Sequence, residues 1–392
     1  MINISKLYCG VPGQSDYLRY SRDNTFSPVV VYNCTRKCNL KCLHCYSSSK
    51  NIAGDNEMTT VEAKRLLSDI AEIKCPVVLF SGGEPLLRED LFELLAEAKR
   101  FGLRTVISTN GTLIDSQTAQ RMAQAGVSYA GVSIDGDEKF HDEFRDAKSS
   151  FKAAMEGIEN CRKAGLKTGL RFTITKANAD HIPFVFDIAV SAGVRRICFY
   201  HLIRTGRAKE LTSPMTQEQT RRAIDTIIEK TDGYVKKGLL DEVLTVGNHA
   251  DAPYLLVKMA REHSRHYESA KELLLLNGGN KTGEKIAGVG WDGNVYADQF
   301  WRNYSLGNIK ENSFRQIWEN PNEPVLKKLR NKSRFADKRC LTCKWFEMCK
   351  GNFRFLGDKP DDKYWLNEPA CYLTDEEITR AKTVPIENAR SF

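Results

Sequence analysis

Three cysteines in one short loop constrain this chain more than any other feature. Cys38, Cys42 and Cys45 follow a C-x-x-x-C-x-x-C spacing, directly after the apolar run 28–32. Three thiolates this close together can hold three irons of a four-iron cluster and leave the fourth iron without a protein ligand. The spacing therefore predicts an iron–sulfur site with one iron open for chemistry.

A zinc site is the main alternative at this loop. His44 lies among the cysteines, and three-Cys, one-His zinc sites use similarly tight spacings. Structural zinc sites usually draw their ligands as separate pairs from opposed loops, whereas all the candidates here lie in one loop. Spacing and context therefore favour the iron–sulfur cluster over zinc, and favour a disulfide least.

The composition is that of a globular protein with a real core. The chain has 392 residues, of which 41% are hydrophobic, and this length suggests two or three domains. The sequence predicts no membrane span and no signal peptide. Because the twelve cysteines fall in clusters, a reducing cytoplasm and metal ligation are expected. The net charge of +8 suits anionic partners, either nucleic acid or a polycarboxylate.

A repeating pattern begins near residue 28. A short apolar strand, a loop, an amphipathic helix and a glycine follow one another, with the glycines at Gly102, Gly126, Gly165 and Gly193. Six strands alternating with helices indicate an α/β fold whose parallel sheet curls into a partial (β/α)6 barrel. The expected strands are residues 28–34, 76–80, 103–108, 128–134, 167–174 and 195–201.

Polar residues gather where these strands end. Working residues of such barrels project from the carboxyl ends of the strands, so these positions are candidates for ligand binding. Glycine lets the backbone approach a ligand, and a carboxylate can stabilise an ammonium group. Each residue could instead be an ordinary turn former or helix cap. The candidates are Gly82, Gly83, Glu84, Asn110, Ser133, Asp135 and Arg171.

A second group of cysteines lies near the other end of the chain. Cys340, Cys343 and Cys349 are close in sequence, and Cys371 follows after a long gap. Four thiolates can complete a cluster with no open iron, which suits electron relay or structural support. A four-Cys zinc site is a serious alternative by spacing.

The first cysteine loop resembles the cluster loop of the radical S-adenosylmethionine (radical SAM) enzymes. His44 stands where that family usually has an aromatic residue, and residues 81–85 resemble the family's GGEP motif. The resemblance implies a 4Fe-4S cluster whose open iron is chelated by SAM. It also implies that Glu84 meets the SAM amino group, Ser133 and Asp135 its ribose, and Arg171 its carboxylate.

Residues from about 287 to 371 resemble the auxiliary-cluster extension called SPASM or, when shortened, twitch. Full SPASM domains have further cysteines here, whereas this chain has Gly288 and Asp298, so one auxiliary 4Fe-4S cluster is expected and not two. The expected organisation is an N-terminal arm, the barrel, a helical connection, the auxiliary domain and a tail, at residues 1–27, 28–210, 211–286, 287–372 and 373–392.

The chain as a whole resembles the tetrapyrrole-modifying branch of these enzymes, chiefly in residues 4–10, 290–295, 298–308 and 369–378. The resemblance implies removal of two acetate side chains from 12,18-didecarboxysiroheme, giving iron-coproporphyrin III in sirohaem-dependent haem biosynthesis. An external electron donor of the ferredoxin or flavodoxin type is implied, and neither nucleic acid nor a membrane is expected as a partner.

A flat polycarboxylate needs aromatic faces and cations around it. The residues that could supply them, although aromatic residues at this density often belong to the core, are Arg204, Arg207, Trp291, Phe300, Trp301, Arg302 and Tyr304. The polar stretch 248–251 could touch substrate or cap the helix after it.

Three alternatives differ in function. One is an enzyme of haem d1 biosynthesis that acts on the propionates of the same substrate. Another is a peptide-modifying radical SAM maturase, which would normally carry a leader-binding domain that residues 1–27 look too short to form. The third, a simple iron–sulfur electron carrier, would have no use for residues 82–84 or for a three-Cys site.

Overall fold

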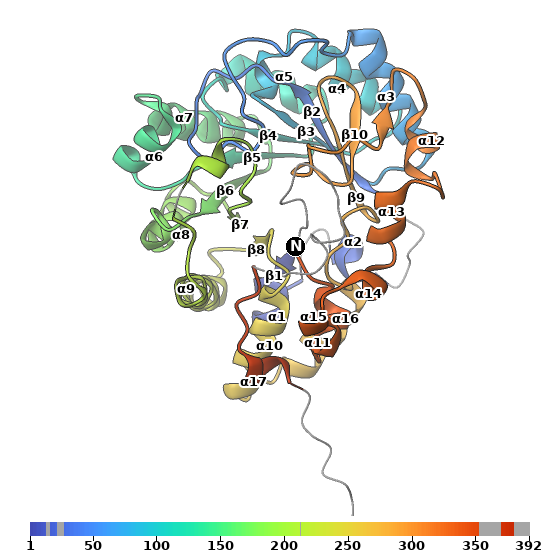
Figure 1. Cartoon of the computed structure of the whole chain (residues 1–392). Helices are drawn as coiled ribbons and strands as arrows, with labels where there is room; N and C mark the ends of the chain where they lie inside the picture. The colour runs from blue at the N-terminus through green and yellow to red at the C-terminus, as the bar shows by residue number, and fades with distance from the viewer. Residues whose placement is uncertain (13–15, 22–26, 212, 353–369, 380–392) are drawn as a thin grey trace, which may run out of the picture.

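One continuous sheet organises the molecule (Figure 1). The structure is a computed structural model, and it describes all residues except 13–15, 22–26, 212, 353–369 and 380–392. The six expected strands form and pair in parallel, in chain order. They are β2 (Val29–Thr35), β3 (Val78–Gly82), β4 (Thr105–Thr109), β5 (Tyr129–Ser133), β6 (Thr168–Ile174) and β7 (Arg196–His201).

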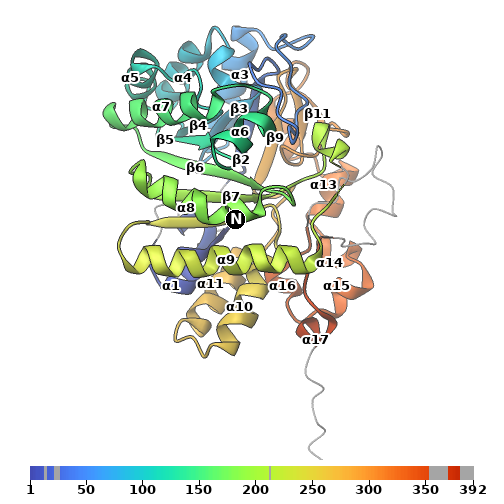
Figure 2. The same ribbon diagram turned by 90° about the vertical axis from the view of Figure 1, so that its left-hand side faces the viewer.

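Helices follow these strands and cover the outer face of the curved sheet (Figures 1 and 2). Gly102, Gly126, Gly165 and Gly193 all have positive φ at helix ends, so the predicted glycine stops are confirmed. The helices are α3 (Thr60–Glu72), α4 (Leu91–Arg100), α5 (Ser116–Gln124), α6 (Glu138–Arg145), α7 (Ser150–Lys163) and α8 (Ile182–Ser191), with the short 3-10 turns η1 (Pro85–Leu87), η2 (Ala179–His181) and η3 (Gly206–Glu210).

The sheet extends beyond the six expected strands on both sides. β8 (Glu242–Val246) pairs in parallel with β7, inside the stretch expected to be a helical connection. On the other side β9 (Ile286–Val289) pairs in parallel with β2, and the short strands β10 (Asn294–Tyr296) and β11 (Gly307–Asn308) follow. The C-terminal extension therefore shares the sheet of the barrel. β9, β10 and β11 have only four, three and two residues, too few to show a periodic pattern.

Three helices flank β8 in the chain, within the stretch 211–286 that was expected to be a helical connection. They are α9 (Gln217–Lys236), α10 (Asp251–Arg261) and α11 (Tyr267–Asn277). The first residues were expected to form a polar arm, and the structure differs. β1 (Ile2–Asn3) pairs antiparallel with β8, and α1 (Ile4–Cys9) and α2 (Asp16–Tyr20) pack beside it, since Ile2, Ile4 and Leu7 are apolar enough to be buried.

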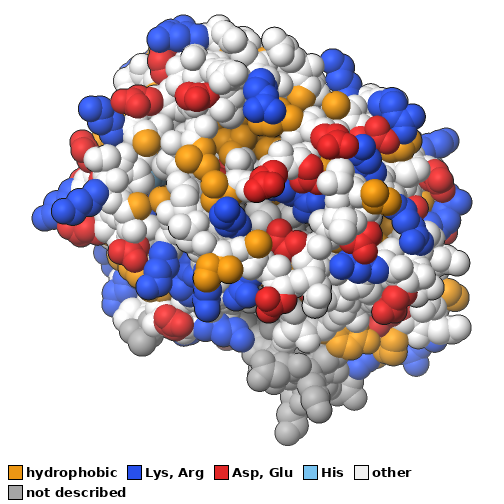
Figure 3. All heavy atoms as spheres, turned by 90° about the horizontal axis from the view of Figure 1, so that it is seen from above, with side chains coloured by type: hydrophobic (Ala, Val, Ile, Leu, Met, Phe, Trp, Pro, Cys, Tyr) orange, Lys and Arg blue, Asp and Glu red, His pale blue; other side chains and the backbone are white. Residues whose placement is uncertain are grey.

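Among the described residues of the C-terminal part, six short helices are present. They are α12 (Phe314–Trp318), α13 (Pro324–Leu329), α14 (Lys332–Phe335), α15 (Lys338–Thr342), α16 (Phe346–Cys349) and α17 (Asp375–Ile378). In the described part of the chain, no helix has the length and apolar character needed to cross a membrane. Seen from above, acidic and basic side chains are interspersed over much of the surface (Figure 3).

Candidate active site

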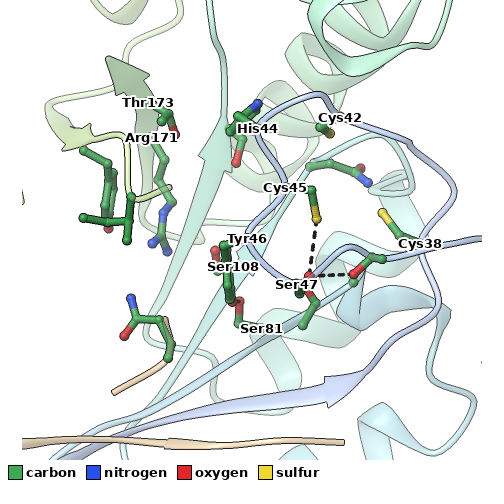
Figure 4. Close-up of a pocket in the computed structure, with 18 of the residues that line it drawn as sticks. Cys38, Cys42, His44, Cys45, Tyr46, Ser47, Ser81, Ser108, Arg171 and Thr173 are labelled. Carbon is green, nitrogen blue, oxygen red and sulfur yellow. Dashed lines mark hydrogen bonds between the residues drawn. The ribbon is translucent and has the colours of Figure 1, made fainter. Parts of the chain in front are cut away.

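The three cysteines of the first loop line one pocket at the carboxyl ends of the barrel strands, and Arg171 lies across it (Figure 4). Each sulfur has a hydrogen-bonding group beside it. Leu40 N–H lies 3.4 Å from Cys38 Sγ, Ser47 Oγ lies 3.3 Å from Cys45 Sγ, and a guanidinium lies 3.8 Å from Cys42 Sγ. Donors around sulfur stabilise thiolates that bind iron, so the residues present fit an iron–sulfur cluster.

Two glycines let the cysteine loop lie against β3. The N–H of Gly83 donates to the carbonyl of Thr35 at 2.7 Å. A Cβ on Gly83 would lie 2.1 Å from the carbonyl oxygen of Lys37, and one on Gly82 would lie 2.4 Å from that of Thr35. Both glycines also line the pocket. Packing of the cysteine loop thus requires glycine at these two positions, and a contact with SAM stays a prediction.

Glu84 is fully buried behind the pocket. Its carboxylate accepts hydrogen bonds from the Thr109 hydroxyl at 2.8 Å, from Asn110 N–H at 2.8 Å and from Leu86 N–H at 3.2 Å. Burial raises its pKa to about 7, against the effect of these hydrogen bonds. Glu84 therefore ties the end of β3 to the end of β4, and it is not among the residues that line the pocket.

Asn110 and Ser133 both line the pocket, as expected for ligand contacts. The side chain of Asn110 donates to Asn39 Oδ1 at 2.9 Å and so reaches the cysteine loop. It also accepts from the N–H and hydroxyl of Thr112. Asn110 therefore joins the end of β4 to the loop that carries the cysteines.

Asp135 is engaged by the protein itself. Its Oδ2 lies 2.6 Å from Arg145 Nη2, and its Oδ1 accepts from Thr173 N–H at 3.2 Å. The other terminal nitrogen of Arg145 is the group beside Cys42 Sγ. Asp135 was expected to contact ribose, but among the side chains lining the pocket it is Arg145 that appears and not Asp135. No sequence signal pointed to Arg145. Its pairing with Asp135 depends on how α6 packs against the end of β5, which the sequence does not show.

His44 lines the pocket and stacks on Phe144, with the ring centroids 4.6 Å apart. Its Nε2 lies 3.7 Å from Asp135 Oδ2. Burial lowers the pKa of His44 to about 4, so the imidazole is neutral at pH 7. The stacking explains how an imidazole takes an aromatic position.

An aromatic wall with one cation faces the cysteines. The Arg171 guanidinium lies 4.6 Å from the ring centroid of Tyr200, and among the described residues it forms no ion pair. Tyr46 packs edge-on against Phe300, with centroids 5.3 Å apart. Gln299 lines the pocket beside Phe300, and its Oε1 is buried without a hydrogen-bond partner. Sequence reasoning missed Tyr46, Tyr200 and Gln299, whose pocket positions follow from strand and loop geometry.

Phe300 lines the pocket as expected, but the other six candidate substrate contacts do not. Arg207 donates to the carbonyls of Cys42 and Ser49, at 2.8 and 2.7 Å, and Arg204 is exposed. Arg207 is therefore part of the packing of the cysteine loop, whereas Arg204 faces solvent.

The remaining four candidates have protein partners in the extension. The guanidinium of Arg302 lies 4.0 Å from the ring centroid of Trp291. Trp301 is buried in a small core with Ala297, Val325 and Leu329. The Tyr304 hydroxyl donates to Glu323 at 2.8 Å. Of this loop, Gln299 and Phe300 reach the pocket, whereas Trp301, Arg302 and Tyr304 do not.

A histidine–carboxylate pair lies on another side of the pocket. His201, at the end of β7, lines the pocket, and its Nε2 lies 3.0 Å from Asp251 Oδ2. Asp251, in the first turn of α10, is fully buried and also accepts from the Tyr372 hydroxyl at 2.7 Å. Asp251 belongs to the polar stretch 248–251, which was the only sequence signal for this pair.

The C-terminal cysteines cluster around α15 and α16. Arg339 Nη1 lies 3.2 Å from Cys371 Sγ, and Trp345 N–H lies 3.4 Å from Cys343 Sγ. Burial, with a contribution from nearby Cys371, raises the pKa of the Cys343 thiol. Across the described residues, no three His, Cys, Asp or Glu side chains converge as they would on a single metal ion.

Gly288 and Asp298 stand where a full SPASM domain has further cysteines. A Cβ on Gly288 would lie 2.7 Å from the carbonyl oxygen of Asp298, so a cysteine side chain has no room there without a backbone shift. The buried carboxylate of Asp298 accepts from the N–H groups of Phe300 and Trp301, at 2.8 and 3.0 Å. This segment therefore forms a tight turn that presents Phe300 to the pocket.

Comparisons with known proteins agree with this site. Residues 32–187 match the model of the radical SAM superfamily, and residues 281–344 match that of the SPASM iron-sulfur cluster-binding domain. The crystal structure of Streptococcus suis SuiB bound to precursor peptide SuiA superposes with a TM-score of 0.71 at 18% identity, covering 89% of this chain and 76% of that chain. The chain belongs to the radical SAM superfamily.

Two relatives match over nearly the whole chain. Fe-coproporphyrin III synthase of Methanosarcina barkeri is 47% identical over 96% of this chain and 99% of its own length. Pre-heme d1 synthase of Dinoroseobacter shibae is 35% identical over 94% of this chain and 92% of its own length. As a radical SAM enzyme with a SPASM-type domain, the chain uses a 4Fe-4S cluster, SAM and auxiliary iron–sulfur.

Proposed function

We propose that this enzyme removes the two acetate side chains of 12,18-didecarboxysiroheme to give iron-coproporphyrin III. The observation that carries the proposal is the 47% identity to Fe-coproporphyrin III synthase, which extends over 96% of this chain. The same resemblance implies a tetrapyrrole substrate and an external one-electron donor of the ferredoxin or flavodoxin type.

The pocket has the chemistry that such a substrate needs. Tyr46, Tyr200 and Phe300 offer aromatic faces to a flat macrocycle, and Arg171 offers a guanidinium without an acidic partner among the described side chains. A charge-assisted hydrogen bond from arginine to a carboxylate contributes roughly 1.5 to 3 kcal/mol. Arg171 could serve either the carboxylate of SAM or one on the substrate.

Residues of the chain would hold the two cofactors as follows. Cys38, Cys42 and Cys45 would ligate three irons of the cluster, and Asn110 and Ser133 would contact SAM at the mouth of the barrel. SAM bound to the open iron supplies, on reduction, a deoxyadenosyl radical that abstracts hydrogen from unactivated carbon. Cys340, Cys343, Cys349 and Cys371 would hold one auxiliary cluster.

Haem d1 biosynthesis is the second candidate. Its support is the 35% identity to pre-heme d1 synthase over 94% of the chain. In that case the propionates of the same macrocycle would be altered and the acetates kept. The lower identity makes this the weaker proposal.

Mass analysis of the macrocycle separates the candidates. The reconstituted, reduced enzyme is incubated with 12,18-didecarboxysiroheme and SAM without oxygen. Two successive losses of an acetate unit support the proposal, and a mono-deacetylated intermediate should accumulate when SAM is limiting, because the substrate must turn between events. Altered propionates with intact acetates would point to the second candidate, and an unchanged macrocycle would contradict both.

A further inference from the structure

The residues assigned above to the cluster and to SAM do not include the pair formed by His201 and Asp251. Asp251 holds the imidazole ring of His201 in one orientation. Nε2 lies 3.0 Å from one oxygen of Asp251, and the Tyr372 hydroxyl occupies the other oxygen at 2.7 Å. The carboxylate is fully buried, whereas the histidine reaches the pocket. A carboxylate held on two sides fixes the orientation of the imidazole ring, and Nδ1 is then the nitrogen not used in the pair.

The proposed reaction needs a proton at the pocket, and this step rests on the proposed function. When a radical forms beside the ring carbon that carries an acetate arm, the bond between ring and arm breaks. A ring double bond forms, and the arm leaves as the fragment •CH2COO−. That fragment becomes acetate by taking one electron and one proton. The electron comes from the external one-electron donor that the enzyme already requires.

We infer that His201 is the catalytic residue that donates this proton, and that Asp251 is its positioning residue. The imidazolium gives its proton to the methylene carbon of the reduced fragment, and the neutral ring is reprotonated from solvent. Atoms and charge balance, because one electron and one proton convert the fragment anion radical into the acetate anion.

Other acidic groups at the pocket are less suited to this role. His44 also lines the pocket, but its nearest carboxylate, Asp135, is 3.7 Å away and already paired with Arg145. The Tyr46 hydroxyl is committed to Asn33 Oδ1 at 2.7 Å. Burial raises the pKa of Tyr200 to about 12, which makes the phenol a weak proton donor. Of these four side chains, His201 alone lines the pocket and lies within hydrogen-bonding distance of a carboxylate oxygen, Asp251 Oδ2 at 3.0 Å.

The test uses the fully reconstituted enzyme in D2O with 12,18-didecarboxysiroheme, SAM and reductant. The variants are His201→Gln and Asp251→Asn, and the matched control is His263→Gln, an exposed histidine on the turn after α10. Three products are measured: 5'-deoxyadenosine, the deuterium content of the released acetate, and the macrocycle mass. Iron content is determined for each protein.

The wild-type chain and His263→Gln should release acetate with one solvent deuterium in its methyl group. His201→Gln should keep its iron and form deoxyadenosine at a rate within about threefold of wild type. Its acetate release should fall on the order of 100-fold, the usual range for a lost general acid, and the residual acetate should still contain one solvent deuterium because D2O then supplies the proton. Asp251→Asn should show the same pattern with a smaller loss.

Two results would overturn the inference. One is wild-type acetate without solvent deuterium, and the other is a His201→Gln protein that releases acetate at the wild-type rate. If His201→Gln loses its iron, Asp251→Asn decides by the same criteria. An untouched macrocycle with the wild-type chain would instead contradict the proposed function, so the two failures are distinguishable.

Discussion

Arg145 and Asp135 form a buried ion pair, with Nη2 and Oδ2 2.6 Å apart, directly behind the first cysteine loop. The pair connects the end of β5 to α6, and the second nitrogen of Arg145 reaches within 3.8 Å of Cys42 Sγ. A buried charge without its partner is costly, so the two side chains depend on each other.

Replacement of Arg145 alone should therefore be strongly destabilising. Arg145→Met leaves the Asp135 carboxylate buried and unpaired, and we expect a loss of about 3 to 5 kcal/mol in the free energy of unfolding. The double variant Arg145→Met, Asp135→Asn should recover most of that loss. Chemical denaturation of the apoprotein measures both. Equal stability of the single and double variants would contradict the coupling.

Arg204 and Arg207 offer a matched pair for testing what the cysteine loop needs. Arg207→Ala removes two hydrogen bonds to the loop carbonyls of Cys42 and Ser49, so the reconstituted protein should bind less iron at the first cluster. Arg204→Ala, at an exposed position, should bind iron like wild type. Iron analysis and electron paramagnetic resonance of the reduced proteins provide the comparison. If the two variants retain the same iron, the loop does not depend on Arg207.

Gly83 should tolerate no side chain, because the cysteine loop lies against it. The added Cβ of Gly83→Ala would lie 2.1 Å from the carbonyl oxygen of Lys37, so the loop must move and cluster reconstitution should fail. Gly233 lies in α9 with no atom within 4 Å of an added Cβ. Gly233→Ala should reconstitute normally and gain roughly 0.5 to 1 kcal/mol of stability. Normal cluster assembly in Gly83→Ala would show that the loop is not so closely packed.

Asp298 should make stability depend on pH. Burial raises its pKa to about 6, above that of an unfolded aspartate, so the folded state binds the proton more tightly. Its contribution is complete below about pH 4 and is lost as pH rises through about 6. Asp298→Asn keeps the hydrogen-bond acceptor for Phe300 and Trp301 and removes this titration.

Urea unfolding of wild type and Asp298→Asn at pH 4 to 8 provides the measurement. The stability of Asp298→Asn relative to wild type should rise by roughly 2 to 3 kcal/mol across this range. A constant difference between the two proteins would mean that the carboxyl group titrates normally in the folded state.

The strands and helices of the barrel could be predicted from the sequence, because the signals for them are local. Apolar runs and helix-ending glycines such as Gly102 identify strands and helix ends without reference to the rest of the chain. β8 and β9 were missed because each is stabilised by pairing with another strand, β7 and β2 respectively. Strand pairing between distant segments leaves no periodic signal.

The candidate site divides in the same way. The spacing of Cys38, Cys42 and Cys45 is readable as a motif, and so are the glycines that pack against the loop. The partners of Arg145 and His201 are not, since each pair joins different elements of the fold. The aromatic candidates show that residue type does not reveal which side chains face a pocket. Trp301 was a candidate substrate contact, but it is buried in a small core of its own.

The central claim is that Cys38, Cys42 and Cys45 hold a cluster with one open iron at which SAM is cleaved. Cys34 is the matched control, because it is fully buried on β2, four residues before Cys38, and is not among the residues lining the pocket. The most direct measurement is formation of 5'-deoxyadenosine from SAM by anaerobically reconstituted, reduced protein. Cys38→Ala, Cys42→Ala and Cys45→Ala should each abolish it, while Cys34→Ala should retain it. Undiminished cleavage by any of the first three variants would contradict the account.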